Sequence, residues 1–141
     1  MSGNTRDMGT GPDEIEGMIT KNSPFSVEET IGRLQEGIGK RGMTLFAEIS
    51  HSGEAERIGL KMQEAHVLIF GNPKGGTPLM VASPLLALDL PLKALIWQSS
   101  DGRVWVSYNS VEYLAARYSI PQGLVGNIAV IDVLIDGALQ A

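Results

Sequence analysis

The sequence predicts an α+β domain of two layers, in which helices pack on a mixed sheet of four to five strands. Segments with strand-like alternation are separated by segments with helical periodicity, an order typical of folds that combine a sheet with helices. The pair Asp101-Gly102, between two apolar segments, indicates an antiparallel hairpin. Because the earlier strands are joined through helical segments, we expect parallel and antiparallel pairs in one sheet.

Length and composition indicate one core. The chain has 141 residues, of which 43% are hydrophobic and 19% are charged, and these values are ordinary for a single globular domain. The first residues are small or polar, so we expect residues 1–14 to form a disordered tail and residues 15–141 to form the domain.

The first half of the domain is expected to supply two strands and two helices. Residues 15–21 are predicted as an edge strand and residues 43–50 as a second strand. Residues 26–41 form the best predicted helix, since Ser26 and Glu29 make a capping box before an apolar stripe. That stripe consists of Val27, Ile31, Leu34 and Ile38. A short helix is expected to begin at Ser52-Gly53.

The middle of the chain predicts a central strand followed by a loop. Residues 67–70 are an unbroken apolar run, as expected of a strand covered on both faces. The strand leads into a glycine-rich loop at residues 71–76, and Thr77 is expected to cap the next helix. Residues 84–90 are expected to form a second short helix.

The last third predicts a hairpin and two helices. With a two-residue turn, Trp97 would share a face with Val106, and Trp105 would lie on the opposite face. Both faces of the hairpin are then largely apolar, so at least one must be covered. Asn109 is expected to cap a helix that ends near residue 118. The apolar stripe of the last helix, residues 124–139, is expected to pack on the sheet or on another subunit.

Several classes of function are excluded or disfavoured by composition. The chain has 11 basic and 16 acidic residues, a net charge of −5 that opposes binding to nucleic acid or to an anionic membrane. There is no cysteine, which excludes disulfides and thiolate metal sites. The most apolar stretch is interrupted by Asn127, Asp132 and Asp136 and is too polar to span a bilayer. We therefore expect a cytoplasmic protein.

Several segments together resemble the family known as domain of unknown function 302. The most specific run is IFGNPKGGTPLM at residues 69–80, and further matches include SVEETI at residues 26–31, FAEI at residues 46–49, and ALDLPLK at residues 87–93. The resemblance spans roughly residues 17–121. It implies a compact, dimeric α+β domain without a settled function. The family pattern places an acid directly before His51, where this chain has Ser50.

Two features are candidates for a site. A glycine-rich segment before a helix can present backbone N–H groups to an anion, and Lys74 adds a charge. His51 follows a strand directly, a position suited to proton transfer or ligand contact. The candidate ligand-binding residues are His51, Gly71, Asn72, Lys74, Gly75, Gly76, Thr77 and Asn109. For both features the alternative is structural: a tight turn, and a histidine that fixes the chain. His51 and Glu54 alone do not make a metal site, and we expect no cofactor.

Three hypotheses of function follow. The first is a homodimer that binds a small anionic molecule at residues 71–77, with His51 at the edge of the site. The second is a hydrolytic or proton-transfer enzyme with His51 as base and Lys74 or Asn109 as electrostatic partners, which requires these groups to meet in one cleft. The third is a structural or partner-binding dimer whose contact surface is the last helix.

Overall fold

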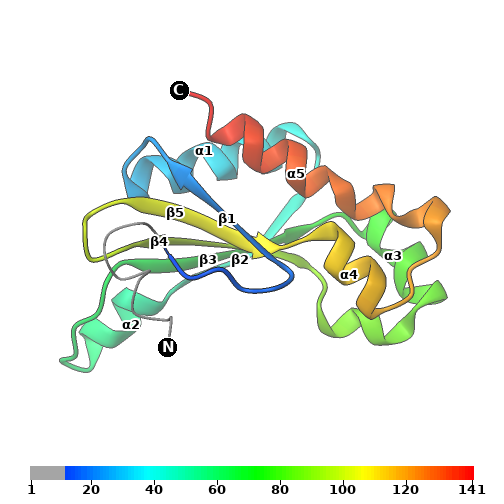
Figure 1. Ribbon diagram of the computed structural model, residues 1–141, viewed down its shortest axis with the longest axis horizontal. Helices are drawn as coiled ribbons and strands as arrows, with labels where there is room; N and C mark the ends of the chain where they lie inside the picture. The colour runs from blue at the N-terminus through cyan, green and yellow to red at the C-terminus, as the bar shows by residue number, and fades with distance from the viewer. Residues whose placement is uncertain (1–11) are drawn as a thin grey trace.

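The computed structural model describes residues 12–141 and shows a sheet with its two longest helices packed on one face (Figure 1). The strands are β1 (Met18–Ser23), β2 (Thr44–Ser50), β3 (Ala65–Gly71), β4 (Leu92–Gln98) and β5 (Val104–Asn109). The helices are α1 (Val27–Lys40), α2 (His51–Arg57), α3 (Pro73–Ala82), α4 (Val111–Arg117) and α5 (Gly126–Ala138), with short 3-10 helices η2 (Pro84–Leu88) and η3 (Gln122–Leu124). The α+β class and the hairpin are confirmed. Residues 1–11, most of the predicted tail, lie outside the described part.

The five strands lie in the order β1-β5-β4-β3-β2, and all four neighbouring pairs are antiparallel. The expectation of a mixed sheet was wrong in this detail. A parallel pair needs a connection that runs back along the whole strand. Helix α2 has seven residues, about 10 Å of helix, and it leads the chain directly back into β3. The longer α1 does cross the sheet, but it joins the two edge strands, which never pair.

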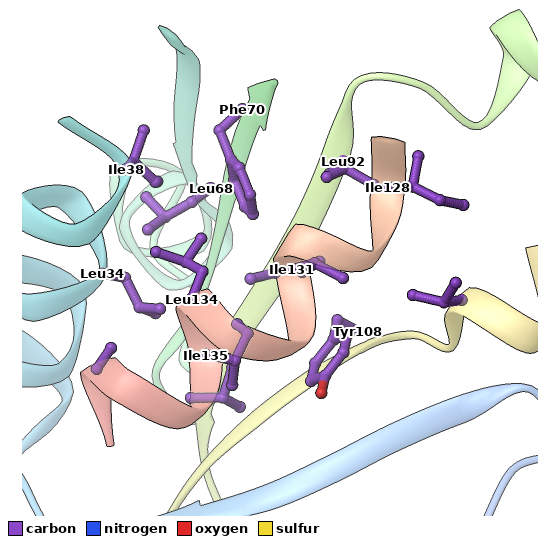
Figure 2. Close-up of a cluster of buried hydrophobic side chains, with 14 of the residues drawn as sticks. Leu34, Ile38, Leu68, Phe70, Leu92, Tyr108, Ile128, Ile131, Leu134 and Ile135 are labelled. Atoms are coloured by element: carbon purple, nitrogen blue, oxygen red, sulfur yellow. The ribbon is translucent and has the colours of Figure 1, made fainter. Parts of the chain in front are cut away.

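Helices α1 and α5 pack together over one face of the sheet and enclose the core (Figure 1). The buried residues of α5 are Ile128, Ile131, Leu134, Ile135 and Ala138. Figure 2 shows α5 side chains meeting Leu34 of α1 and Leu68 of β3. The apolar stripe of the last helix is thus buried within its own chain. Of the two expected positions, packing on the sheet is the one observed, and the sheet and α1 leave little of the stripe open to a second subunit.

Two helices begin at other residues than the sequence indicated. Helix α3 begins at Pro73, because the side chain of Asn72 accepts a hydrogen bond from the N–H of Lys74 (3.0 Å) and takes the capping place expected of Thr77. Helix α4 is capped by Ser110, which accepts from the N–H of Tyr113 (2.9 Å), and not by Asn109. Both polar side chains stand next to a strand end, and the strand geometry decides which of them reaches the free N–H groups.

The hairpin has a longer connection than the sequence indicated, and this reverses the position of one tryptophan. Gln98 pairs with Val104, so five residues join β4 to β5. A shift of one residue moves every side chain of one strand to the opposite face. Trp97 therefore pairs directly with Trp105, and both indole rings lie on the face of the sheet opposite α1 and α5.

Candidate functional site

His51 and the segment at residues 71–77 lie at opposite ends of the sheet. In the antiparallel ladder of β2 and β3, Thr44 pairs with Gly71, whereas Ser50 pairs with His66. His51 follows Ser50 directly, so a distance of about 20 Å along the strands separates it from Gly71. The exposed His51 is the first residue of α2. The single cleft that the enzyme hypothesis requires for His51 and Lys74 is not formed.

The backbone N–H groups proposed to hold an anion already have partners. The N–H of Lys74 donates to the Asn72 side chain, and those of Gly75 and Gly76 donate to the Asn72 carbonyl (2.9 and 2.8 Å). The carbonyl of Gly75 accepts from Asn127 of α5 (3.0 Å). Residues 71–77 therefore end β3, start α3 and join α3 to α5. Lys74 and Thr77 are exposed.

Asn109 is the last residue of β5 and pairs with Met18, at the same end of the sheet as Gly71. It is half-buried, and its side chain lies on the face of the sheet opposite α1 and α5. Within residues 12–141, no three carboxylate or histidine side chains gather as a metal site would require. Of the predicted site residues, Lys74 and Asn109 belong to one end of the sheet and His51 to the other.

The uncovered face of the sheet carries side chains that, apart from Asn109, were not predicted as site residues. We call this surface the open face, defined by the side chains on the side of the sheet opposite α1 and α5. Its residues on β1, β5, β4 and β3 are Met18, Thr20, Asn22, Trp105, Ser107, Asn109, Lys93, Leu95, Trp97, Ala65, Val67 and Ile69. Most of these side chains are only partly buried. The signal in the sequence was a hairpin apolar on both faces, which requires a cover that no described helix supplies in full.

The two tryptophans on the open face are held in fixed positions. Their ring centroids are 6.4 Å apart, with an angle of 30° between the planes. The indole N–H of Trp97 donates to Ser107 (3.0 Å), whose hydroxyl also bonds Thr20 (2.8 Å). The indole N–H of Trp105 donates to Ser99 (2.9 Å). The indole N–H groups are thus satisfied inside the chain; the partly exposed Trp97 presents apolar surface, whereas Trp105 is only 8% exposed and packs against it.

Residues 12–17, which we call the arm, run back across the open face before β1 begins (Figure 1). The turn between arm and strand is made at Gly17, with φ of +82°. Together the arm and the hairpin border a groove of about 1050 Å³, which continues into a second hollow of about 580 Å³. The larger part is lined by Pro12, Asp13, Ile15, Met18, Thr20, Gln63, Leu95, Trp97, Gln98, Ser99, Ser100, Asp101 and Ser107. Glu14, Glu16 and Trp105 join the lining in the second hollow.

The groove is bordered at the hairpin by Asp101, an ionised group. The hydroxyl of Ser99 and the backbone N–H of Arg103 donate hydrogen bonds to the Asp101 carboxylate. These bonds, that of Ser99 most strongly, lower its pKa from 3.8 to about 2. The guanidinium of Arg103 also bonds Asp101 (2.8 Å) and lies 5.0 Å from the centre of the Trp105 ring. Asp101 and Arg103 therefore form a charged pair at the rim.

A second exposed apolar surface lies at the opposite edge of the sheet, on β2. Leu45, Phe46 and Ile49 are 36%, 51% and 39% exposed. The ladder to β3 shifts between Leu45 and Ala47, so Phe46 is the extra residue of a bulge and lies beside Gly71. The other edge strand, β1, presents Lys21 and Asn22.

Comparison with known proteins shows one family and a few relatives. The model of the family described as "Domain of unknown function DUF302" matches residues 19–139. Proteins named "Fluoride-specific ion channel FluC 1" from Brucella suis biovar 1 and Brucella abortus biovar 1 are each 38% identical over 114 residues. These matches cover 81% of this chain but only 44% and 42% of the Brucella proteins. The chain thus spans less than half the length of these relatives.

A solved structure supports the fold. It is described as "Crystal structure of uncharacterized conserved protein DUF302 from Bacillus stearothermophilus" and has a TM-score of 0.73 with this chain. The similarity covers 89% of this chain and 97% of the other, at 20% sequence identity. In the described part of this chain, no helix has the length and apolar character needed to cross a membrane.

Proposed function

Because the chain belongs to the DUF302 family, whose description names no activity, we propose from the geometry alone that it is a homodimeric binding domain. The ligand is a small molecule with an apolar body, held in the groove on the open face. The observation that carries this proposal is the pair of hydrogen-bonded tryptophans in a groove of about 1050 Å³. Ligand pockets are commonly about 300–1000 Å³ in volume and combine apolar walls with a few polar groups.

The groove residues suit binding better than catalysis. Trp97, Leu95 and Met18 offer apolar contact, while Thr20 and Ser107 hold each other through a hydrogen bond. A hydrolytic centre needs a nucleophile and a base in contact. The hydroxyls of Thr20 and Ser107 bond each other, and the hydroxyl of Ser99 donates to Asp101, whose pKa of about 2 makes that carboxylate a weak base. The fixed indole rings lose little conformational freedom when a ligand packs on them.

The test uses a neutral, polarity-sensitive dye such as Nile red. Trp97 and Trp105 are the only tryptophans, so quenching of intrinsic fluorescence reports contact with this face. Replacing the partly exposed Ile15 and Met18 (Ile15→Ser with Met18→Ser) should weaken dye binding about thirtyfold, since each loses roughly 1 kcal/mol of apolar contact. A matched control is Val81→Ser with Leu85→Ser, which removes exposed apolar side chains elsewhere. Equal effects of the two double variants would overturn the proposal.

The homodimer is proposed at the β2 edge, which lies across the sheet from the groove strand β1. An exposed apolar edge strand offers unpaired backbone groups to a second strand, whereas charged side chains discourage such pairing. Strand β2 exposes Leu45, Phe46 and Ile49 beside one charged residue, Glu48, which accepts a hydrogen bond from Gln35, whereas β1 carries Lys21. Two copies joined by antiparallel β2 strands would form one sheet with five strands from each copy.

Light scattering after size-exclusion chromatography tests the dimer. The wild-type chain should elute with the mass of two 15.1 kDa subunits. The double variant Phe46→Lys with Ile49→Lys should be monomeric, because two lysines on each copy would face each other across the twofold axis. The double variant Val81→Lys with Leu85→Lys adds the same charge at another exposed surface and should remain dimeric. A monomeric wild type, or an unchanged dimer in the β2 variant, would contradict this interface.

The Brucella relatives suggest where such a domain is used. A segment similar to this chain forms less than half of proteins that are named fluoride-specific ion channels. We propose that the segment is a binding domain attached to the channel and does not form the fluoride path. This is supported by the N-termini of α1, α2, α3 and α4, where the side chains of Ser26, Ser50, Asn72 and Ser110 each accept from an N–H group that would otherwise be open to an anion; α5, which Val125 precedes, has no side-chain cap.

A further inference from the structure

The charge of the groove narrows the class of ligand. Among the lining residues that fall within 12–141 there are four carboxylates, those of Asp13, Glu14, Glu16 and Asp101, and no lysine or arginine. Asp101 is paired with Arg103 at the rim. The arm residues Glu14 and Glu16 therefore supply the negative charge on which this argument depends. An anionic ligand in this groove would be repelled, which is the opposite of the charge expected from the loop at residues 71–77.

The aromatic floor is compatible with a positive charge. A cation is attracted to the face of an indole ring, and tryptophan is the best aromatic residue for this contact. The chain already shows the arrangement once, since the guanidinium of Arg103 lies 5.0 Å from the centre of the Trp105 ring. The neighbouring Trp97 lines the larger part of the groove together with Leu95.

Resting on the proposed function, we propose that the ligand is an organic amine: a monovalent cation attached to a flat or aliphatic apolar body. The body lies on Trp97 and Leu95, and the ammonium group lies toward Glu14 and Glu16 of the arm. Charge complementarity selects this ligand over a neutral or anionic molecule of the same shape. The arm thus closes one side of the groove and also determines the sign of the charge that is bound.

Three probes with one aromatic skeleton test this inference: 1-naphthylmethylamine, 1-naphthylmethanol and 1-naphthoic acid, measured by isothermal titration calorimetry. The amine should bind about tenfold more tightly than the alcohol, because two carboxylates act on it at short range, and the acid should bind most weakly. The two indole N–H resonances should shift with the amine and identify the face. Added salt should reduce the preference for the amine.

The matched variants are Glu14→Gln with Glu16→Gln in the arm, and Glu36→Gln with Glu56→Gln on α1 and α2, which change the net charge equally. The arm variant should lose the preference for the amine while it binds the alcohol as the wild type does, and the control should keep the preference. If amine and alcohol bind equally to the wild type, ligand binding in the groove is supported but the proposed preference for a cationic ligand is overturned. An amine preference that survives in the arm variant overturns it as well. If none of the three probes binds, the proposed function itself fails.

Discussion

Gly17 makes the turn that places the arm on the open face. Its φ of +82° is costly for any residue with a side chain, and a Cβ atom there would lie 2.3–2.8 Å from ring atoms of Tyr113. Gly42, at the end of α1, has φ of +71° but no atom within 4 Å of a built Cβ. The first glycine is therefore constrained by backbone conformation and by packing, and the second by backbone conformation alone.

The two glycines predict different losses of stability. Gly42→Ala should lower the free energy of unfolding by about 1 kcal/mol, the cost of the left-handed conformation, and Gly17→Ala should lower it by about 2–3 kcal/mol because the Tyr113 ring must also move. Urea denaturation measures both. Adding Tyr113→Ala to Gly17→Ala should remove most of the difference. Equal losses in the two single variants would show that the ring yields without cost.

Residues near strand ends were the least predictable from sequence. Ser26 was correctly predicted as the cap of α1, because one candidate stands before a clear apolar stripe. Before α3 the chain offers both Asn72 and Thr77, and before α4 both Asn109 and Ser110. All four have side chains able to cap a helix, and composition alone does not order them. The choice depends on the residue at which the preceding strand leaves the sheet, which is a tertiary property.

The position of the candidate site depends on the register of the β4–β5 hairpin, which differs by one residue from the register expected for a two-residue turn. Asp101-Gly102 correctly located the hairpin, and Gly102 has the positive φ that such a turn requires. The connection is longer because Asp101 accepts hydrogen bonds from Ser99 and from the backbone of Arg103. These side-chain bonds bring both tryptophans to the open face. The candidate site could not be found from alternation alone, because both possible registers leave apolar residues on both faces.

The connections explain why predicted site residues failed to meet. His51 and Lys74 both follow strands directly, and if β2 and β3 were parallel, they would lie at the same end of the sheet. Antiparallel pairing places them at opposite ends instead. The sequence supports the existence of each strand, but the direction of pairing is decided by whether the intervening helix crosses the sheet.

The whole molecule is a sheet with one face buried beneath α1 and α5 and the other face covered only in part by the arm and α2. Polar side chains of β1 and β5 bond side chains of α5 near the β1 edge of the sheet. Lys21 of β1 bonds Asp136 of α5, and the hydroxyl of Tyr108 donates to Asp132 of α5 (3.1 Å). The ammonium of Lys21 also lies 5.7 Å from the centre of the Tyr108 ring.

These bonds between the sheet and α5 predict a loss of stability at alkaline pH. Burial raises the pKa of the Tyr108 phenol above its ordinary value of 10.0. Burial alone would lower the pKa of Lys21, but its hydrogen bonds to Asp136 and Tyr108 outweigh that effect and raise the pKa above 10.5. Both groups keep their protons longer in the folded chain than in the unfolded one. Their contribution to the free energy of unfolding is therefore complete below the ordinary pKa values and declines as pH rises through the raised pKa values of the folded chain.

The free energy of unfolding, measured in urea at a fixed protein concentration, should be insensitive to these two groups below pH 10.0 and should fall above it. In the double variant Lys21→Met with Tyr108→Phe neither group titrates, so the alkaline decline should be shallower, although stability at neutral pH is also lower because Asp132 and Asp136 lose their partners. The slope of the free energy of unfolding against pH separates titration from a loss of contacts, since a loss of contacts alone lowers the whole curve equally at every pH. Parallel curves for the variant and the wild type would mean that the titration of Lys21 and Tyr108 does not affect the stability of the fold.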